Sequence, residues 1–333
     1  MRFRAILILL GLASLAPTRL LSQSALSNTD RARLAEANSL VRAVAKRVWP
    51  GWERTPFALL LVADSAEYLV GHPRPTSEFT HPVYDSVIAM DVLSRPRVLA
   101  PTLLATFPAV GGLPTIVVGT AERTGKSSAE WVLTLLHEHF HQWQYSLPDY
   151  YRRSEELDLA GGDSSGMWML NYPFPYDSAP VQAASKDLAH ALLRALDTTP
   201  RTRGPAIHAV LRARAALANH LTAAEMRYLE FQLWQEGVAR FIEYRAAELA
   251  FRSHRARRAY KSLPDYTSYA DLSKRSRTAL KRELDGLDLR KNRRISFDPL
   301  GAAYALLLES TQADWKQTYE SRPFVLTALL KGK

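Results

Sequence analysis

The sequence has no cysteine among its 333 residues. Disulfide bonds, thiolate metal ligands and lipid attachment through cysteine are therefore excluded, so any transition metal must be held by histidine and carboxylate side chains. A run of about 18 consecutive apolar residues, as a membrane-spanning helix requires, is also missing. Repeats of fixed period and low-complexity segments are absent too. The remaining composition, 47% hydrophobic and 23% charged, is that of an ordinary globular protein with ample material for a core.

The first residues have the layout of a secretory signal peptide. Residues 1–4 are basic, residues 5–16 are mostly apolar, and the polar stretch that follows contains the small residues Ser22 and Ser24. We therefore expect residues 1–22 to be a signal peptide and the protein to be secreted or periplasmic. A short membrane anchor or a core helix is the alternative interpretation of the same residues.

The charge balance is basic. The formal net charge of +10 falls to +7 once residues 1–22, with their three arginines and no acids, are set aside. The excess is concentrated in residues 252–258 and 291–294. Solvated helix faces and loops explain such runs most simply, and contact with anionic lipid or cell-surface polymer is the alternative. No nucleic-acid partner is expected for an exported protein.

Residues 29–146 are predicted to form a β-rich N-terminal lobe. Helical periodicity at residues 29–49 opens this region. Strand patterns follow at residues 57–62, 67–70, 83–91 and 115–119. A helix then begins at Ser127, because Glu130 three residues later completes a capping box. Apolar residues cover nearly the whole circumference of this helix, which predicts that it is buried.

The buried helix contains the motif HExxH as His137, Glu138 and His141. Residues four apart lie on one face of an α-helix, so His137 and His141 can bind one metal ion from the same side. Glu138 lies about 100° further round, where it can reach a water molecule at the metal. Buried polar side chains of this kind are costly unless paired or ligated. The motif predicts a zinc hydrolase site with Glu138 as general base, whereas His139, on the opposite face, is expected to be a packed histidine.

A third ligand is needed, because catalytic zinc usually has three protein ligands. Residues 234–243 resemble the W-x-E-G-x-A-x-[FY]-x-E signature of gluzincin (HExxH…E) zinc metallopeptidases, the peptidase-MA-like group related to aminopeptidase N. The resemblance implies that Glu236 is the third zinc ligand. Glu243 lies seven residues later on the same face, where it can accept a hydrogen bond from a ligating histidine. Gly237 would allow two helices to approach closely at the metal.

The sequence departs from that family in spacing. Glu236 follows His141 by 95 residues, much more than in the family, so residues 147–221 would form an insertion. Three acidic residues follow His141 at a distance closer to that of the family, but they lack the flanking signature and are the weaker candidates for the third ligand. They are Glu155, Glu156 and Asp158.

Residues 298–304 resemble the start of a helix in the same family. In that family the helix begins with a tyrosine that stabilises the oxyanion of the tetrahedral intermediate. Asp298 occupies the tyrosine position here, so Tyr304 becomes the candidate oxyanion donor, with Tyr266 and Tyr269 as alternatives. The exopeptidase motif G-x-M-E-N is absent. An edge strand near residues 115–119 is expected to align an extended peptide by strand addition.

The sequence thus predicts an α+β, zincin-like fold. A β-rich N-terminal lobe would lie over the HExxH helix, and a mostly helical lobe, residues 147–333, would carry the third ligand. The predicted function is that of a secreted metallopeptidase acting on peptide or protein substrates, with Zn²⁺ on His137, His141 and Glu236 and with Glu138 and Tyr304 as catalytic residues. A zinc-binding protein without activity, suggested by Asp298, and a basic module that binds anionic polymers are the alternatives.

Overall fold

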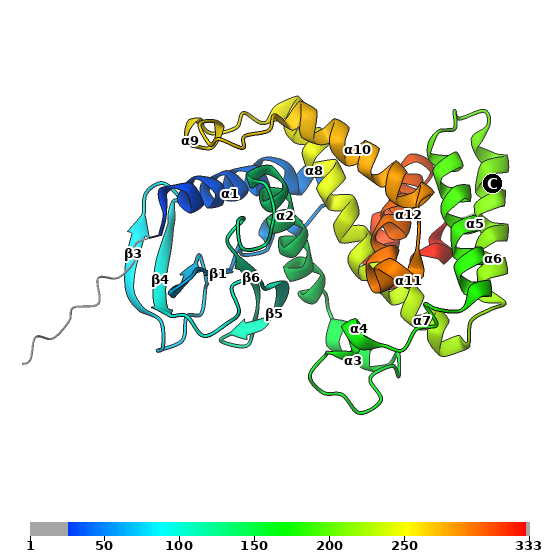
Figure 1. Ribbon diagram of the computed structural model, residues 1–333, viewed down its shortest axis with the longest axis horizontal. Helices are drawn as coiled ribbons and strands as arrows, with labels where there is room; N and C mark the ends of the chain where they lie inside the picture. Colours follow the sequence, from blue (N-terminus) through cyan, green and yellow to red (C-terminus); the bar gives the residue numbers. More distant parts are fainter. Residues whose placement is uncertain (1–25, 331–333) are drawn as a thin grey trace, which may run out of the picture.

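The computed structural model describes residues 26–330 and has an α+β architecture. A six-stranded sheet occupies the N-terminal region and the C-terminal part is mostly helical, as predicted (Figure 1). The proposed signal peptide lies outside the described residues. Within residues 26–330, no helix has the length and apolar character needed to span a membrane.

The sheet has the strand order β3-β4-β2-β1-β6-β5. The strands are β1 (Leu59–Val62), β2 (Ala66–Val70), β3 (Thr80–Asp85), β4 (Met90–Pro96), β5 (Leu104–Val110) and β6 (Leu113–Gly119). β1 and β6 pair in parallel, and every other pair is antiparallel. All of β1 and residues 115–119 of β6 are buried, and both strands lie inside the sheet.

Two strand predictions were wrong. Residues 83–91 do not form one strand but contain the end of β3, a turn and the start of β4. Residues 115–119 are not at an edge, because β6 lies between β1 and β5. The edge on this side of the sheet is β5, whose alternation is interrupted by Pro108. Proline removes a backbone donor and is therefore tolerated on edge strands.

The helices α1 (Asn28–Val48) and α2 (Ser128–Tyr145) pack against each other beside the sheet. α2, the HExxH helix, contacts β5 and β6 on one side and α8 of the helical part on another. The capping box of Ser127 and Glu130 is present, and residues 128–144 are buried apart from Glu130. The prediction of a buried helix that begins at Ser127 is confirmed.

A π-helical turn divides a long helical stretch of the C-terminal part. A capping box of Thr222 and Glu225 starts α7, and the turn η2 separates α7 from α8. The elements are α3 (Tyr150–Glu155), α4 (Trp168–Asn171), α5 (Ala179–Leu196), α6 (Arg203–Ala218), α7 (Ala223–Gln232), η2 (Leu233–Gly237), α8 (Val238–Ser253), α9 (Arg258–Lys261), α10 (Tyr269–Asp285), α11 (Leu289–Asn292), α12 (Phe297–Thr311) and α13 (Trp315–Ser321), with 3₁₀ turns at Trp52–Arg54, Arg293–Ser296 and Thr327–Leu329.

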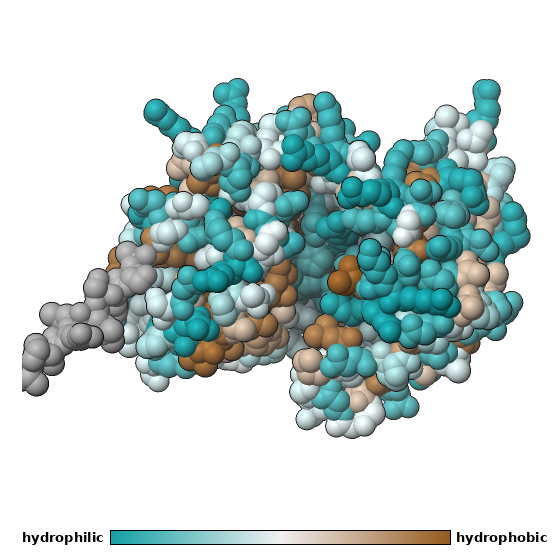
Figure 2. Space-filling view, viewed as in Figure 1, coloured by the Kyte–Doolittle hydropathy of each residue, from teal (hydrophilic) through white to brown (hydrophobic). Residues whose placement is uncertain are grey.

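One hydrophobic core joins the sheet-bearing and helical parts. It extends from Leu34 of α1 through α2 and α8 to Leu330. A smaller cluster, which includes Leu60 and Val117, covers the other face of the sheet. The molecular surface is hollowed between the sheet-bearing and helical parts, with α2 on one side of the hollow and α8 and α12 on the other (Figures 1 and 2).

Candidate metal centre

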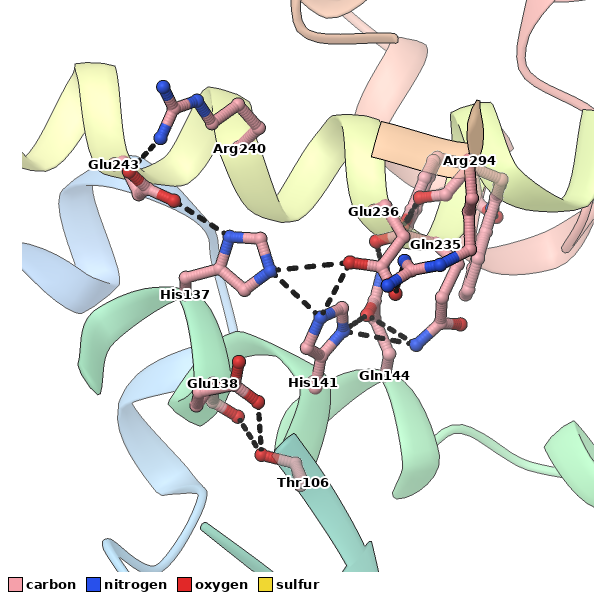
Figure 3. A network of polar contacts seen from close by, with 12 residues as sticks. Thr106, His137, Glu138, His141, Gln144, Gln235, Glu236, Arg240, Glu243 and Arg294 are labelled. Atoms are coloured by element: carbon pink, nitrogen blue, oxygen red, sulfur yellow. Dashed lines mark hydrogen bonds and ion pairs between the residues drawn. The ribbon is translucent and has the colours of Figure 1, made fainter. Parts of the chain in front are cut away.

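The structure brings together three side chains from α2 and η2. The Nε2 atoms of His137 and His141 lie 3.0 Å apart. The Oε2 atom of Glu236 lies 3.5 Å from each of these nitrogens. Figure 3 shows the three atoms facing one common space. The 94 residues between His141 and Glu236 form an excursion through α3 to α7 that returns beside α2.

A buried group on α2 has the composition of a metal site. His137, Glu138 and His141 each offer a ligand atom, and these atoms lie within 4.8 Å of one another, so the group could bind a metal ion. Glu138 and Glu236 therefore compete for the third position. Thr106 Oγ1 of β5 lies 2.8 Å from Glu138 Oε2 and donates to it, whereas Glu236 Oε2 faces both imidazoles. The geometry favours Glu236 as ligand and leaves Glu138 beside it.

Hydrogen bonds orient both imidazole rings. His137 Nδ1 lies 2.8 Å from Glu243 Oε1, and His141 Nδ1 lies 2.6 Å from Gln144 Oε1. Each Nδ1 faces an oxygen acceptor, and the Gln235 amide nitrogen also lies 3.0 Å from His141 Nδ1. A proton on each Nδ1 would leave Nε2 as the atom that faces a metal, once the second proton of His137 is displaced. Glu243 therefore has the orienting position that its spacing from Glu236 predicted.

The Gln144 amide is itself fixed. Its nitrogen donates to Tyr319 Oη at 2.7 Å and lies 3.0 Å from the Gln235 carbonyl oxygen, so its oxygen must face His141. Gln235 is held in turn by Tyr150, whose hydroxyl donates to Gln235 Oε1 at 2.9 Å. Sequence reasoning missed Gln144 and Gln235. The only signal was position, since Gln144 lies three residues after His141 and Gln235 directly precedes Glu236.

The carboxylates set the charge of the centre. Burial alone would lower the pKa of His137, but hydrogen bonds to Glu236 and Glu243 raise it to about 10. Burial would likewise raise the pKa of Glu236, yet the charge of His141 and hydrogen bonds from both histidines hold it well below its usual value. Glu243 is balanced by Arg240, whose Nη1 lies 2.7 Å from Glu243 Oε2. Without a metal, the two carboxylates therefore stabilise a proton on His137, in the place that a metal cation would occupy.

Asp298 and Arg294 both lie close to Glu236. Arg294 Nη1 is 3.4 Å from Glu236 Oε1, the oxygen that does not face the histidines. Burial and the charge of Glu236 raise the pKa of Asp298 to about 7. One Asp298 oxygen is buried with no hydrogen-bond partner among the described residues. Asp298, which occupies the position of the family's tyrosine, therefore lies beside the site but carries a carboxyl group in place of a phenol.

The tyrosines considered as oxyanion donors lie elsewhere. Tyr304 is fully buried, and its charged neighbours are Glu230 and Arg214. Tyr269 donates to Glu36 at 2.7 Å, and Tyr266 has Glu36 and Asp271 as charged neighbours. Within residues 26–330 no contact joins any of these tyrosines to His137 or His141, so the catalytic role of Tyr304 has no support from its position.

Other residues that the sequence suggested also lie outside the metal centre. His139 is fully buried, its Nε2 lies 3.0 Å from the Thr55 carbonyl oxygen, and its ring packs on Trp52, as expected for a packed histidine. The alternative acids are exposed on or after α3, and the metal-binding group found among the described residues does not include them. They are Glu155, Glu156 and Asp158. In the basic segments, Arg252 and Arg293 pair with acidic side chains of the same chain.

Comparisons with known proteins give no assignment. No protein-family model matches the chain, and searches of curated proteins and of solved structures find no significant match. The site's chemistry must therefore be inferred from its own geometry.

Proposed function

We propose that the protein is a zinc-dependent metallopeptidase. The observation that carries this proposal is the triangle of donor atoms, with edges of 3.0, 3.5 and 3.5 Å between His137 Nε2, His141 Nε2 and Glu236 Oε2. Ligands about 2.05 Å from a tetrahedral zinc ion lie about 3.3 Å from one another. Two imidazoles and a carboxylate, with a fourth position open, are also the donor set of catalytic zinc in peptidases.

The surrounding residues suit peptide hydrolysis. A zinc ion held by the three ligands would supply Lewis acidity, which lowers the pKa of water and polarises a carbonyl group. Glu138 would accept a proton from the attacking water and deliver it to the leaving amine. Thr106 would keep one carboxylate oxygen of Glu138 fixed, and Glu243 and Gln144 would keep the imidazoles in place.

The edge strand β5 offers a place for an extended peptide. It carries Thr106, so its residues run past the proposed general base. A substrate strand could add to its free edge before Pro108, which has no backbone donor. The resemblance to gluzincins and the expected secreted or periplasmic location belong to the same proposal.

Replacing Glu138 by glutamine tests the proposal. Glu138→Gln should keep one zinc ion per chain while hydrolysis of a mixed peptide library falls by at least about 100-fold. Glu130→Gln, the same change on an exposed residue of α2, serves as the control and should remain active. Full activity in Glu138→Gln would overturn the role of the general base.

Asp298 favours one other function, a zinc-binding protein without hydrolytic activity. A carboxyl group stands where the resemblance expects a tyrosine, and it lies beside Glu236. Stoichiometric zinc combined with no cleavage of any library peptide would select this alternative. Absence of zinc from the purified protein, and failure to take it up, would reject both.

A further inference from the structure

Peptide hydrolysis needs a hydrogen-bond donor for the oxyanion that forms on the substrate carbonyl. The structure leaves the expected tyrosines away from the centre, and Arg294 is already engaged with Glu236. Two other tyrosines, Tyr145 and Tyr150, have Glu236 as a charged neighbour. The Tyr150 hydroxyl is occupied by Gln235, which leaves Tyr145 to be considered.

Helix geometry directs Tyr145 toward the centre. It lies four residues after His141 and seven after Glu138, and both spacings return to nearly the same face of α2. Side chains on a helix lean toward its N-terminus, so the Tyr145 ring leans back over the preceding turn. The rings of Tyr145 and His141 are accordingly stacked, with centroids 6.2 Å apart and planes at 24°. Glu138 is a charged neighbour of Tyr145 as well as Glu236.

The ring of Tyr145 is held while its hydroxyl is free. Tyr150 packs edge-on against the ring at 4.9 Å, and Tyr151 stacks on it at 6.1 Å. Among the described residues the hydroxyl has no hydrogen-bond partner. Its oxygen is also not one of the fully buried side-chain atoms that lack a partner. Tyr145 is only partly buried, so this donor is open to a bound molecule.

We propose that Tyr145 is a catalytic residue whose hydroxyl donates a hydrogen bond to the substrate oxyanion, an inference that rests on the proposed peptidase function. As the water oxygen bonds to the carbonyl carbon, the electron pair of the C=O π bond moves to oxygen. Tyr145 stabilises that charge and keeps its own proton. Glu138 takes the water proton and passes it to nitrogen as the carbon–nitrogen bond breaks.

Tyr145→Phe removes only the hydroxyl, and the control Tyr151→Phe removes the neighbouring hydroxyl on the exposed ring. Each variant is loaded with Co²⁺, and inorganic phosphate, a tetrahedral oxyanion, is titrated while the visible spectrum of the cobalt is followed. We expect unchanged cobalt uptake in both variants and a roughly 10- to 100-fold weaker phosphate affinity in Tyr145→Phe alone. The kcat for library peptides should fall by a similar factor, with little change in KM.

Phosphate affinity and kcat equal to wild type in Tyr145→Phe would overturn the assignment. Loss of cobalt binding in that variant would overturn it too, because the role would then be structural. The failure of the peptidase proposal looks different: the wild type would bind cobalt and phosphate but cleave no peptide. In that case the loss of phosphate affinity in Tyr145→Phe would still assign an oxyanion-binding role to the hydroxyl.

Discussion

Gly237 and Gly301 lie so close together that a Cβ atom built on Gly237 would be 2.4 Å from the Cα atom of Gly301. This contact joins η2 to α12 directly after the proposed ligand Glu236. The expected close approach of two helices at Gly237 is present, but the second helix is α12 and not the HExxH helix. Single π-helical turns of this kind are frequent at functional sites, where they redirect a side chain.

Gly237→Ala should destabilise the protein by about 1–3 kcal/mol, because the new methyl group meets backbone atoms that cannot move aside. Urea denaturation followed by circular dichroism measures the change. Gly286→Ala is the control, since its φ of −94° suits alanine and its Cβ would approach only the Arg282 carbonyl oxygen at 3.2 Å. Equal stability of the two variants would contradict the close contact of η2 with α12.

Glu236→Ala should reduce zinc affinity by more than about 100-fold. That is more than the loss expected when a residue that only orients a ligand is removed. The matched comparison is Glu243→Gln, which leaves all three proposed ligands but weakens the hydrogen bond to His137 and the ion pair with Arg240. That variant should lose at most about 10- to 100-fold in zinc affinity, because the lower pKa of His137 offsets part of the loss. Competition with a chromophoric chelator gives both values. A normal affinity in Glu236→Ala would remove Glu236 from the ligand set.

Thr106→Val should lower kcat by roughly 10-fold while zinc content stays at the wild-type level. The substitution keeps the shape of the side chain and removes the hydroxyl that lies 2.8 Å from Glu138 Oε2. The general base would then lose its fixed position but not its charge. Steady-state kinetics and metal analysis on the same samples provide the test, and an unchanged kcat would show that Thr106 does not position Glu138.

Zinc binding should release a proton. Hydrogen bonds to Glu236 and Glu243, acting against burial, raise the pKa of His137 to about 10 in the metal-free protein. The proton therefore stabilises the metal-free fold fully below the unfolded pKa of about 6.5, and this contribution is lost as the pH rises toward 10. Because zinc must displace that proton, its affinity should rise by about tenfold per pH unit in this range.

Calorimetry at pH 7.5 in buffers of different ionisation enthalpy counts the protons released on zinc binding, and we expect about one from this group. Glu243→Gln should release fewer, because loss of the carboxylate lowers the pKa of His137 toward its ordinary value. Binding without proton release in the wild type would contradict the assigned charge of the site.

Local patterns predicted much of this fold. The capping boxes at Ser127 and Thr222 depend on residues three apart, so both helix starts could be predicted from the sequence. β5 was missed because Pro108 breaks its alternation, and the edge was misplaced because strand order depends on contacts between distant segments. The interruption at η2 could not be foreseen either, since it accompanies the packing of Gly237 on Gly301.

The sequence by itself determined which groups can share a helix face, since a period of 3.6 residues places His137, His141 and Tyr145 along one stripe of α2. Tertiary structure alone decided which distant groups meet them. The return of Glu236 after 95 residues, the orientation of Gln144 and the removal of Tyr304 to another part of the core all follow from long-range packing. Such contacts depend on the simultaneous burial of many side chains, which no local spacing encodes.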